Sequence, residues 1–534
     1  MAIIGLNKKN LRELKIKDIN DRLSMMGCPV DNEDKEKIIV DISPNRPDLL
    51  SEQGIIRALK TFCGKEKGLK QYKAEKSDYT VILDSSLKDI RPFTACAVVK
   101  NLKFNNEKIE EIIDIQEKLH ATYGRNRKKI AIGIYPFEKI EMPITFKALP
   151  PDEIKFQPLE ADREMTGFQI LSQHKAGREF AHLLEGKKKF SVFIDNKGNI
   201  MSMPPIINSH KTGKITEKTT DVFIECSGFD FNALSKCLNI IVCALSDMGG
   251  KIYSVKLNGI NKITPELQTS KIKININNVN KILGLQLKET DIKKLLEKMG
   301  FSYNNKTVEI PAYRTDILHE IDITEDIAIA YGYENFKHEI PQISTIGQED
   351  KLEIIKRKVA ELMIGLNLIE TCSYNLTNNE DENKKMNDNK ELIKVLNAKT
   401  NYNVLRASVL PSLMRILSEN KDKEYPQQIF EIGRTFQKNL IEEEKIAIAI
   451  IHEKSNFTEI KKILEYLSRN FELNLKIEGT KHPSFIEGRC GEILFGKKKV
   501  GIIGEINPQV LENFNLSLPT IALELNISEV FENK

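Results

Sequence analysis

The spacing of hydrophobic and polar residues along this chain changes between a period of two and a period near 3.6, which predicts a protein that mixes strands and helices. Four apolar runs, FTACAVVKNL, KIAIGIY, KFSVFID and DVFIEC, are typical of buried strands. The runs IEEIIDIQEKLHATYG and FNALSKCLNIIVCALSDMGG have helical spacing instead. Because these runs alternate between residues 86 and 265, this part is predicted to be an α+β domain.

One pattern occurs twice. Residues 15–64 and 287–333 each predict a helix that stops at Met-Gly, a short strand, an Arg-x-Asp turn and a second helix. The turns contain Arg46 and Asp48 in the first segment and Arg314 and Asp316 in the second. Two copies so far apart indicate one helix-strand-helix unit used twice rather than a solenoid.

The chain from residue 350 onward predicts a second large α+β domain. A helical run, KLEIIKRKVAELMIGLNLIE, precedes the strand-like runs QQIFEIGRTF, KIAIAIIHE and EILFGKKKVGIIGEI. The polar segment TNNEDENKKMNDNK lies between them. Its composition predicts a mobile surface loop.

Length and composition bound these predictions. A chain of 534 residues is too long for one core, and we predict four domains, over residues 1–85, 86–265, 266–345 and 346–534. No run of eighteen apolar residues and no charged-then-apolar N-terminus is present, so we expect a cytoplasmic protein with no membrane contact. The eight scattered cysteines form no CxxC pair and are predicted to be reduced and buried.

The net charge is only +4, from 80 basic and 76 acidic residues, which does not indicate a nucleic-acid binder but leaves a local basic face open. The segment TYGRNRKK, residues 122–129, carries four basic residues. Its alternatives are a phosphate contact and, more commonly, a solvated loop.

Three acids in the second repeat share one helix face. Asp322, Glu325 and Asp326 stand at i, i+3 and i+4, and Asp316 precedes them in the turn. Two interpretations of this face remain open, a metal ion or a solvated acidic surface near a helix N-terminus. Asp48 is the counterpart of Asp316, so both could cap the helices that follow them.

The first repeat has different residues at the three helical positions. Gly54, Arg57 and Ala58 stand where the second repeat has its acids. The shared scaffold therefore does not require these acids.

A Pro-Pro pair follows a predicted strand in SMPPIINS. Proline removes an amide donor and fixes the backbone, so Pro204 and Pro205 can present Asn208 and Ser209 at the strand end. The simpler interpretation is an ordinary edge-strand terminator.

These motifs together resemble one family, the β subunit of phenylalanyl-tRNA synthetase in its shorter archaeal and eukaryotic form. The resemblance rests on five segments in order along nearly the whole chain: ISPNRPDLLSEQGIIRAL, SMPPIINS with DVFIEC, PAYRTDILHEIDITEDIAIAYGY, VLRASVLPSLMRIL, and HPSFIEGRCGEILFGKKKVGIIGEINPQVLENF. It implies an α+β multidomain fold in which the repeats flank an editing (B3/B4-like) domain at 86–265. A B5-like domain at 266–345 and a class II synthetase-like antiparallel sheet module at 346–534 would follow.

The resemblance also implies partners and a metal. The family works as an (αβ)₂ heterotetramer that attaches phenylalanine to its tRNA with ATP, and the α subunit binds most of the ATP and L-phenylalanine. Its pattern Asp-x₅-Asp-x₂-Glu-(Glu/Asp) falls on Asp316, Asp322, Glu325 and Asp326, which are thereby expected to bind Mg²⁺ at the α interface. Hard carboxylate oxygens without nitrogen or sulfur donors suit this ion.

The resemblance implies an editing pocket that hydrolyses tyrosine wrongly attached to the phenylalanine tRNA. A hydrophobic pocket rejects an added hydroxyl by only about a hundredfold, so a second pocket that binds the hydroxyl is needed. No nucleophile is assigned, since positioning and a held water can suffice. The expected lining residues are Pro204, Pro205, Asn208, Ser209, Glu225 and Ser227.

In the C-terminal module Arg434 of IFEIGRTF resembles the arginine that ends one ATP-binding motif of class II enzymes. Residues 350–534 contain no Gly-x-Gly-x-x-Arg segment, so no aminoacylation residue is assigned to this chain. The chain also has no spare length for the RNA-binding additions of longer bacterial β subunits. That argues against a large tRNA role for TYGRNRKK.

Two other classes of protein compete with this interpretation. A stand-alone hydrolase of mischarged tRNA would act without an α subunit. A non-catalytic nucleic-acid-binding protein would use the helix–turn–strand repeats, which also serve in DNA recognition, but near-neutral charge and the acidic face at 322–326 weigh against it.

Overall fold

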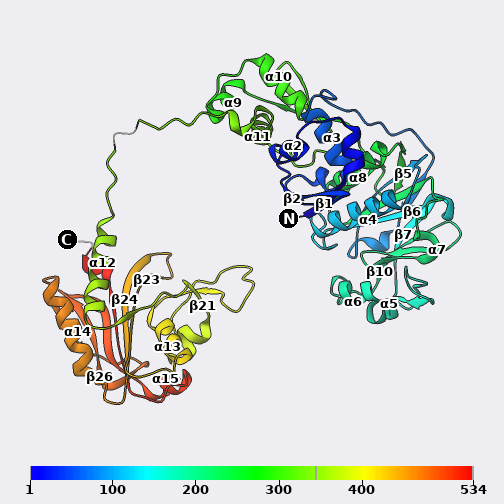
Figure 1. Cartoon of the computed structure of the whole chain (residues 1–534). Helices are drawn as coiled ribbons and strands as arrows, with labels where there is room; N and C mark the ends of the chain where they lie inside the picture. The colour runs from blue at the N-terminus through cyan, green and yellow to red at the C-terminus, as the bar shows by residue number, and fades with distance from the viewer. Residues whose placement is uncertain (1, 343–344, 532–534) are drawn as a thin grey trace. The chain divides into compact units, whose positions relative to one another are not determined.

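The computed structural model (Figure 1) describes residues 2–342 and 345–531. The chain forms two compact units, Met1–Ile340 and Pro341–Lys534. Both mix helices with sheets, as the hydrophobic pattern predicts. No helix in the described part of the chain is long and apolar enough to span a membrane.

The first unit opens with a small sheet of order β1-β3-β2 and three helices. Its elements are β1 (Ala2–Asn7), α1 (Lys8–Glu13), α2 (Ile19–Met25), β2 (Val30–Glu33), β3 (Lys37–Ile42) and α3 (Glu52–Phe62). The single strand predicted here is a hairpin of β2 and β3 instead. The polar run DNEDKEK, residues 31–37, contains most of β2 and the turn to β3, and its composition obscured the shorter strand.

Two sheets face each other in the middle of the unit. One has the order β14-β5-β13-β6, and the other the order β12-β11-β10-β7-β4-β15-β16. The first comprises β5 (Phe93–Lys100), β6 (Ile130–Pro136), β13 (Val222–Gly228) and β14 (Lys251–Tyr253). The second comprises β4 (Thr80–Leu83), β7 (Ile144–Leu149), β10 (Phe190–Ile194), β11 (Ile200–Met203), β12 (Ile207–Asn208), β15 (Val255–Asn258) and β16 (Lys262–Thr264).

Side-chain alternation along β5 explains the layers. Ala95, Ala97 and Val99 share a core with α8 (Phe231–Asp247) and α4 (Asn106–Ala121). Cys96 and Val98 share the core between the two sheets. A strand buried on both faces is continuously apolar, which is why FTACAVVKNL does not alternate.

A small lobe packs around β10 and β11 with its own apolar core. It contains β8 (Lys155–Phe156), β9 (Met165–Thr166), α5 (Gly167–Gln173), α6 (Lys175–Phe180) and α7 (His210–Gly213).

The first unit ends with a sheet of order β17-β19-β18 and three helices around one core. The elements are β17 (Ser270–Lys273), α9 (Ile276–Leu283), α10 (Glu289–Lys298), β18 (Ser302–Asn304), β19 (Thr307–Ile310) and α11 (Glu320–Tyr331). Here too the predicted single strand is a hairpin, turned by Asn305 and Lys306 in left-handed backbone. The order helix, hairpin, Arg-x-Asp turn, helix is the same in residues 19–62 and 289–331.

The second unit has a seven-stranded sheet of order β20-β23-β24-β28-β27-β26-β25, antiparallel except at β20. Along β24, Ile446, Ile448 and Ile450 face the core that contains α12, α14 and α16, whereas Ala447 and Ala449 face α13 and α15. The strands are β20 (Ile369–Glu370), β23 (Gln427–Phe436), β24 (Glu442–Ile451), β25 (Leu475–Gly479), β26 (Phe485–Phe495), β27 (Lys498–Ile506) and β28 (Thr520–Asn526). The helices are α12 (Lys351–Gly365), α13 (Leu410–Glu419), α14 (Phe457–Asn470), α15 (Pro508–Asn513) and α16 (Ile527–Phe531); β21 (Leu376–Thr377) pairs with β22 (Val404–Leu405) beside the sheet.

The segment TNNEDENKKMNDNK is not the surface loop that its composition predicts. It contains a π-helical turn, Glu380–Lys384, in which Asp381, Glu382 and Asn383 are buried. The Asn383 side chain accepts from the Lys390 amide at 2.8 Å and donates to the Lys390 carbonyl at 2.9 Å. Polar side chains that satisfy the local backbone can hold such a segment in place, which composition alone does not reveal.

The cysteines also depart in part from the prediction. All eight are free, and six are buried, but Cys63 is half-buried and Cys372 is exposed.

Candidate functional sites

All four predicted acids line one small cavity of about 220 Å³. Asp322, Glu325 and Asp326 project from α11, which begins at the predicted Glu320, and Asp316 comes from the preceding turn. Arg46 and Arg314 from the two Arg-x-Asp turns line the same cavity. The fold therefore brings the two related segments together at the acidic face.

Arg314 holds two of the four acids. Its guanidinium donates to Asp316 from Nε at 2.9 Å and from Nη2 at 2.7 Å, and Nη2 also donates to Asp326 at 2.7 Å. Burial raises the pKa of Asp326, and the charge of Arg314 opposes that shift. These two carboxylates already have a cation between them.

The other two acids have no ion pair with residues 2–342 or 345–531. Asp322 Oδ2 accepts from the backbone amides of Leu318 and His319, both at 2.8 Å, at the N-terminus of α11. Glu325 is exposed and makes no hydrogen bond or ion pair with residues 2–342 or 345–531. Within these ranges, no group of three or more His, Cys, Asp or Glu side chains is arranged to hold a metal ion.

The interpretation of Asp48 and Asp316 as helix caps is wrong. Asp48 instead accepts two bonds from Arg46, both at 2.8 Å, just as Asp316 pairs with Arg314. Ser51 caps α3, with its hydroxyl accepting from the Gly54 amide at 3.0 Å. An aspartate two residues after an arginine can close a bidentate pair, and this pair replaces the cap.

A larger cavity, of about 720 Å³, lies at the Pro-Pro segment. Pro204, Pro205, Asn208 and Glu225 line it, as predicted from sequence. Ser209 and Ser227 do not: both are buried, and Ser227 accepts from the Arg91 guanidinium at 3.1 Å. Other polar or aromatic lining residues are Gln116, Glu117, His120, Arg127, Glu160, His174, Lys175, Glu179, Phe180, His210 and Lys214.

Glu225 is the buried acid of this cavity. It is 1% exposed on β13, and its Oε1 accepts from the Tyr135 hydroxyl at 3.3 Å. Its Oε2 is buried without a hydrogen-bond partner in the described part of the chain. Burial raises the pKa of Glu225 to about 8, against the opposing charge of Arg91. At pH 7 the side chain is therefore a neutral acid that can both donate and accept.

Gly133 makes room for this acid. It is the cross-strand neighbour of Glu225 on β6. A Cβ atom there would lie 2.6 Å from Glu225 Oε1 and 2.3 Å from the Tyr135 hydroxyl. Any larger residue would push both groups away.

Sequence reasoning missed His120. It is 4% exposed, and its Nε2 accepts from the Ile132 amide at 2.8 Å, which leaves Nδ1–H for Glu117 at 3.3 Å. Burial lowers the pKa of His120, and an Nε2 that accepts a hydrogen bond carries no proton. Nothing in the sequence around His120 distinguishes it from an ordinary helical residue.

Arg127, from the basic segment TYGRNRKK, also lines this cavity. Its Nη1 donates to the Ile206 carbonyl at 2.9 Å and its Nη2 to Glu117 at 3.0 Å, and it stacks 4.3 Å from the Phe180 ring centroid. The solvated-loop interpretation of TYGRNRKK is thus wrong for this residue. Arg127 ties the segment to the chain that follows Pro205.

Arg434 in the second unit is held by glutamates of the neighbouring strand. It bonds Glu444 at 2.9 Å and Glu442 at 2.6 Å. Nearby, Arg406 is buried and pairs with Glu431 at 2.6 Å. A pair between adjacent strands accounts for Arg434, and a buried pair between β23 and the segment after β22 accounts for Arg406.

Comparisons with known proteins place the chain among aminoacyl-tRNA synthetases. Three families match along it: the B3/4 domain over residues 94–239, the tRNA synthetase B5 domain over 272–333, and the phenylalanyl tRNA synthetase beta chain CLM domain over 337–527. The cavity with Pro204 and Glu225 falls in the first match, and the four acids fall in the second.

Relatives give the particular family. The phenylalanine–tRNA ligase beta subunit of Pyrococcus abyssi is 38% identical over 98% of this chain and 97% of its own length, and that of Archaeoglobus fulgidus is 39% identical over 96% and 95%. A crystal structure of an N-terminal fragment of the phenylalanyl-tRNA synthetase beta subunit from Pyrococcus horikoshii matches with a TM-score of 0.59 and 38% identity, over 62% of this chain and 99% of the fragment. The chain belongs to the family of phenylalanine–tRNA ligase beta subunits.

Proposed function

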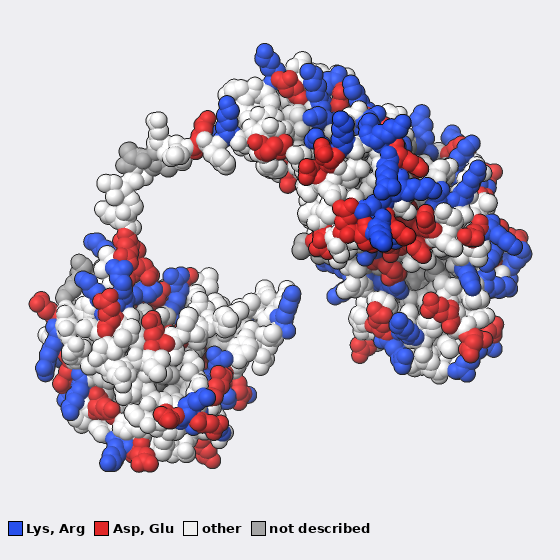
Figure 2. Space-filling view, in the orientation of Figure 1, with Lys and Arg blue, Asp and Glu red and all other residues white. Residues whose placement is uncertain are grey.

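We propose that this chain works in the cytoplasm as the β subunit of an (αβ)₂ phenylalanine–tRNA ligase and is active only with its α subunit, which binds most of the ATP and L-phenylalanine. The observation that carries this proposal is the match to β subunits over nearly the full length of both chains. The second unit supports it, because large apolar side chains are exposed there, including Tyr374 (85%), Leu396 (88%) and Ile369 (66%). Figure 2 shows broad uncharged surface on this unit. Such a surface is typical of a protein interface.

The proposed domain organisation follows the sequence prediction. Residues 1–85 form the N-terminal domain, 86–265 the editing domain, 266–345 the B5-like domain and 346–534 a class II synthetase-like module. The three family matches support the last three assignments. The largely antiparallel sheet of the second unit supports the fourth.

The chemistry of the acidic cavity fits magnesium, which we propose binds there through Asp322 and Glu325. These two carboxylates have no cationic partner among the described residues, whereas Asp316 and Asp326 are both ion-paired with Arg314. Magnesium commonly keeps several waters and needs only one or two carboxylates. Exposed Leu318 and Ile321 beside the acids are suited to a subunit interface.

The test of the metal site is assembly with the α subunit across a magnesium titration. The variant Asp322→Asn with Glu325→Gln should raise the magnesium concentration needed for assembly. Glu334→Gln, beyond the end of α11, is the matched control and should behave as wild type. Equal magnesium dependence in all three proteins would refute the site.

The cavity at Glu225 is proposed to bind the tyrosyl group of mischarged tRNA. Its buried neutral acid has one oxygen free, which is the partner that a tyrosine hydroxyl needs and that phenylalanine cannot use. Water adds to the ester carbonyl, the bond to the ribose oxygen breaks, and tyrosine and tRNA with a free hydroxyl are released. Positioning of substrate and water suffices, so no nucleophile is assigned.

The ligase function is tested by attaching labelled phenylalanine to its tRNA. This chain alone, an α subunit alone and the two co-expressed are compared. We expect activity only in the pair. Deacylation of mischarged tRNA by this chain without any α subunit, and no stable complex, would favour a stand-alone hydrolase instead.

A further inference from the structure

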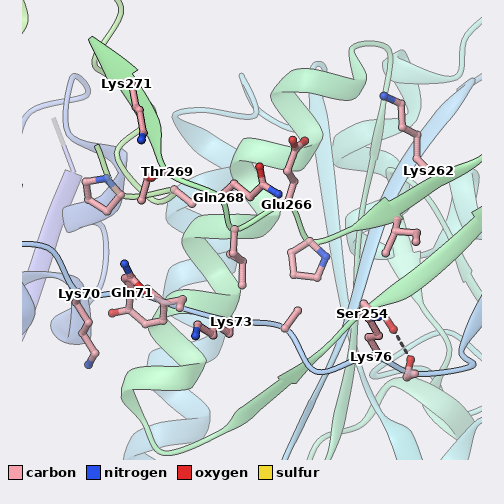
Figure 3. Close-up of a pocket in the computed structure, with 18 of the residues that line it drawn as sticks. Lys70, Gln71, Lys73, Lys76, Ser254, Lys262, Glu266, Gln268, Thr269 and Lys271 are labelled. Carbon is pink, nitrogen blue, oxygen red and sulfur yellow. Dashed lines mark hydrogen bonds between the residues drawn. The ribbon is translucent and has the colours of Figure 1, made fainter. Parts of the chain in front are cut away.

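A cavity of about 1260 Å³ in the first unit is lined by lysines but is not the strongest anion site. Figure 3 shows Lys70, Lys73 and Lys76 along one segment of the chain, and Lys262 and Lys271 on two others. Lys70 is paired with Asp247 at 2.7 Å, and Lys271 with Glu309 at 2.9 Å. Much of the positive charge there is already compensated.

A smaller cavity of about 470 Å³ has positive charge that is only partly compensated, because Arg127 pairs with Glu117 but the other cations of its described lining have no ion pair. It adjoins the proposed editing pocket, because Arg127 and Pro205 line both. No Asp or Glu is among its described lining residues. The lining residues that can carry positive charge are Arg91, Arg127, Lys128, His182 and Lys187.

Arg91 is the central observation. It is 3% exposed, and its guanidinium donates from Nε to the Ser227 hydroxyl at 3.1 Å and from Nη2 to the Ser227 carbonyl at 2.6 Å. It has no ion pair within residues 2–342 and 345–531, and its Nη1 makes no hydrogen bond there. The acid whose charge acts on Arg91 is Glu225, which burial keeps protonated at pH 7, so Arg91 is a buried cation without an ion pair. Such a cation is costly, and an anion in the cavity would relieve a cost that the fold already bears.

An aromatic side chain completes the lining. Phe229 is 52% exposed, and the Arg91 guanidinium lies 5.5 Å from its ring centroid. Cations beside an exposed aromatic face are the usual means of binding single-stranded nucleic acid, through the phosphate and the base. The lining thus favours a nucleotide over a simple inorganic anion.

We propose that this cavity binds a phosphodiester at the 3′ end of the RNA whose aminoacyl group occupies the neighbouring pocket. The proposal rests on the proposed editing function, since the ester in the Glu225 pocket is carried by a 3′-terminal nucleoside. The shared wall at Arg127 and Pro205 keeps the two parts of the substrate adjacent. Arg91 supplies the buried charge, and Lys128 and Lys187 supply charge at the mouth.

The test compares two small substrates on the full chain with its α subunit: the tyrosyl ester of adenosine and the tyrosyl ester of cytidylyl-(3′→5′)-adenosine, which adds one phosphodiester. Wild type should hydrolyse the second ester with a kcat/KM about tenfold to a hundredfold higher than that for the first. This factor corresponds to the free energy of one charge-assisted hydrogen bond. Arg91→Gln should reduce this ratio toward one. An equal kcat/KM for the two esters in wild type would overturn the proposal.

Lysine variants keep the test valid if Arg91→Gln does not fold. Lys187 lines the cavity, and the equally exposed Lys188 beside it does not. Lys187→Ala with Lys128→Ala should lower the ratio several-fold, whereas Lys188→Ala should leave it unchanged. A ratio that falls equally in both would reveal a general charge effect and overturn the proposal.

Binding measured apart from hydrolysis separates the two proposals. Cytidylyl-adenosine should bind at least tenfold more tightly than adenosine, and inorganic phosphate should compete only weakly. If neither ester is hydrolysed but this preference persists and is lost in Arg91→Gln, editing fails and the phosphodiester site stands. If phosphate binds as well as the dinucleotide, or the dinucleotide binds no better than adenosine, the RNA site is refuted.

Discussion

Replacing Glu225 with glutamine should make the stability of the first unit less dependent on pH. The pKa of Glu225 is raised from 4.5 to about 8 by burial, so folding favours the protonated acid. A group with a raised pKa contributes its full stability below pH 4.5 and loses it as the pH rises toward 8. Glutamine mimics the protonated acid and cannot ionise.

The magnitude follows from the two pKa values. Between pH 5 and pH 8, wild type should lose roughly 3 to 4 kcal/mol of stability through this one side chain, and Glu225→Gln should lose none of it. The difference in unfolding free energy between the two proteins should therefore grow in the variant's favour with rising pH and level off above pH 8.

Hydrogen exchange measured by mass spectrometry suits a chain with two units. The opening free energy of β13 amides is followed from pH 5 to pH 9 in both proteins, after correction for intrinsic exchange rates. Amides of β24 in the second unit are the internal control and should not differ between wild type and variant. Parallel pH profiles for β13 would refute a neutral Glu225 and, with it, the argument for hydroxyl recognition.

Three further predictions test the proposed sites. Glu225→Ala should lower kcat/KM for hydrolysis of tyrosyl-tRNA about tenfold, which is what one hydrogen bond contributes. The kcat/KM for hydrolysis of phenylalanyl-tRNA should change less. An equal loss for both substrates would contradict selective binding of the hydroxyl. Asp326→Ala should destabilise the first unit by roughly 2 to 3 kcal/mol, because Arg314 then keeps only Asp316 of its two ion-pair partners. Hydrogen exchange of the α11 amides measures this loss. Asp322→Asn with Glu325→Gln should raise at least tenfold the magnesium concentration for half-maximal aminoacylation by the assembled enzyme, and an unchanged titration would exclude them as ligands.

The relation between Arg314 and the acids changes how the metal site is understood. From spacing, four carboxylates look like four equivalent ligands. In the fold, Arg314 is ion-paired with Asp316 and Asp326, and Asp322 and Glu325 have no cationic partner among the described residues. A structural ion pair thus lies beside the two acids that we propose as metal ligands.

The sequence by itself determined the features that depend on local periodicity. Four strands and two helices of residues 86–265 were predictable, namely β5, β6, β10, β13, α4 and α8, because side-chain spacing records which face of each element is buried. The spacing of Asp322, Glu325 and Asp326 fixed them on one side of α11 for the same reason. Five ordered motifs identified the family.

Only the tertiary structure decided which distant segments meet. It placed Arg127 against the chain after Pro205 and left Ser227 bonded to Arg91 rather than in the pocket. It also made Glu225 a neutral acid, because the pKa of a carboxyl depends on how much water the surrounding segments exclude. Burial and long-range pairing are properties of the packed chain, and no local pattern in the sequence records them.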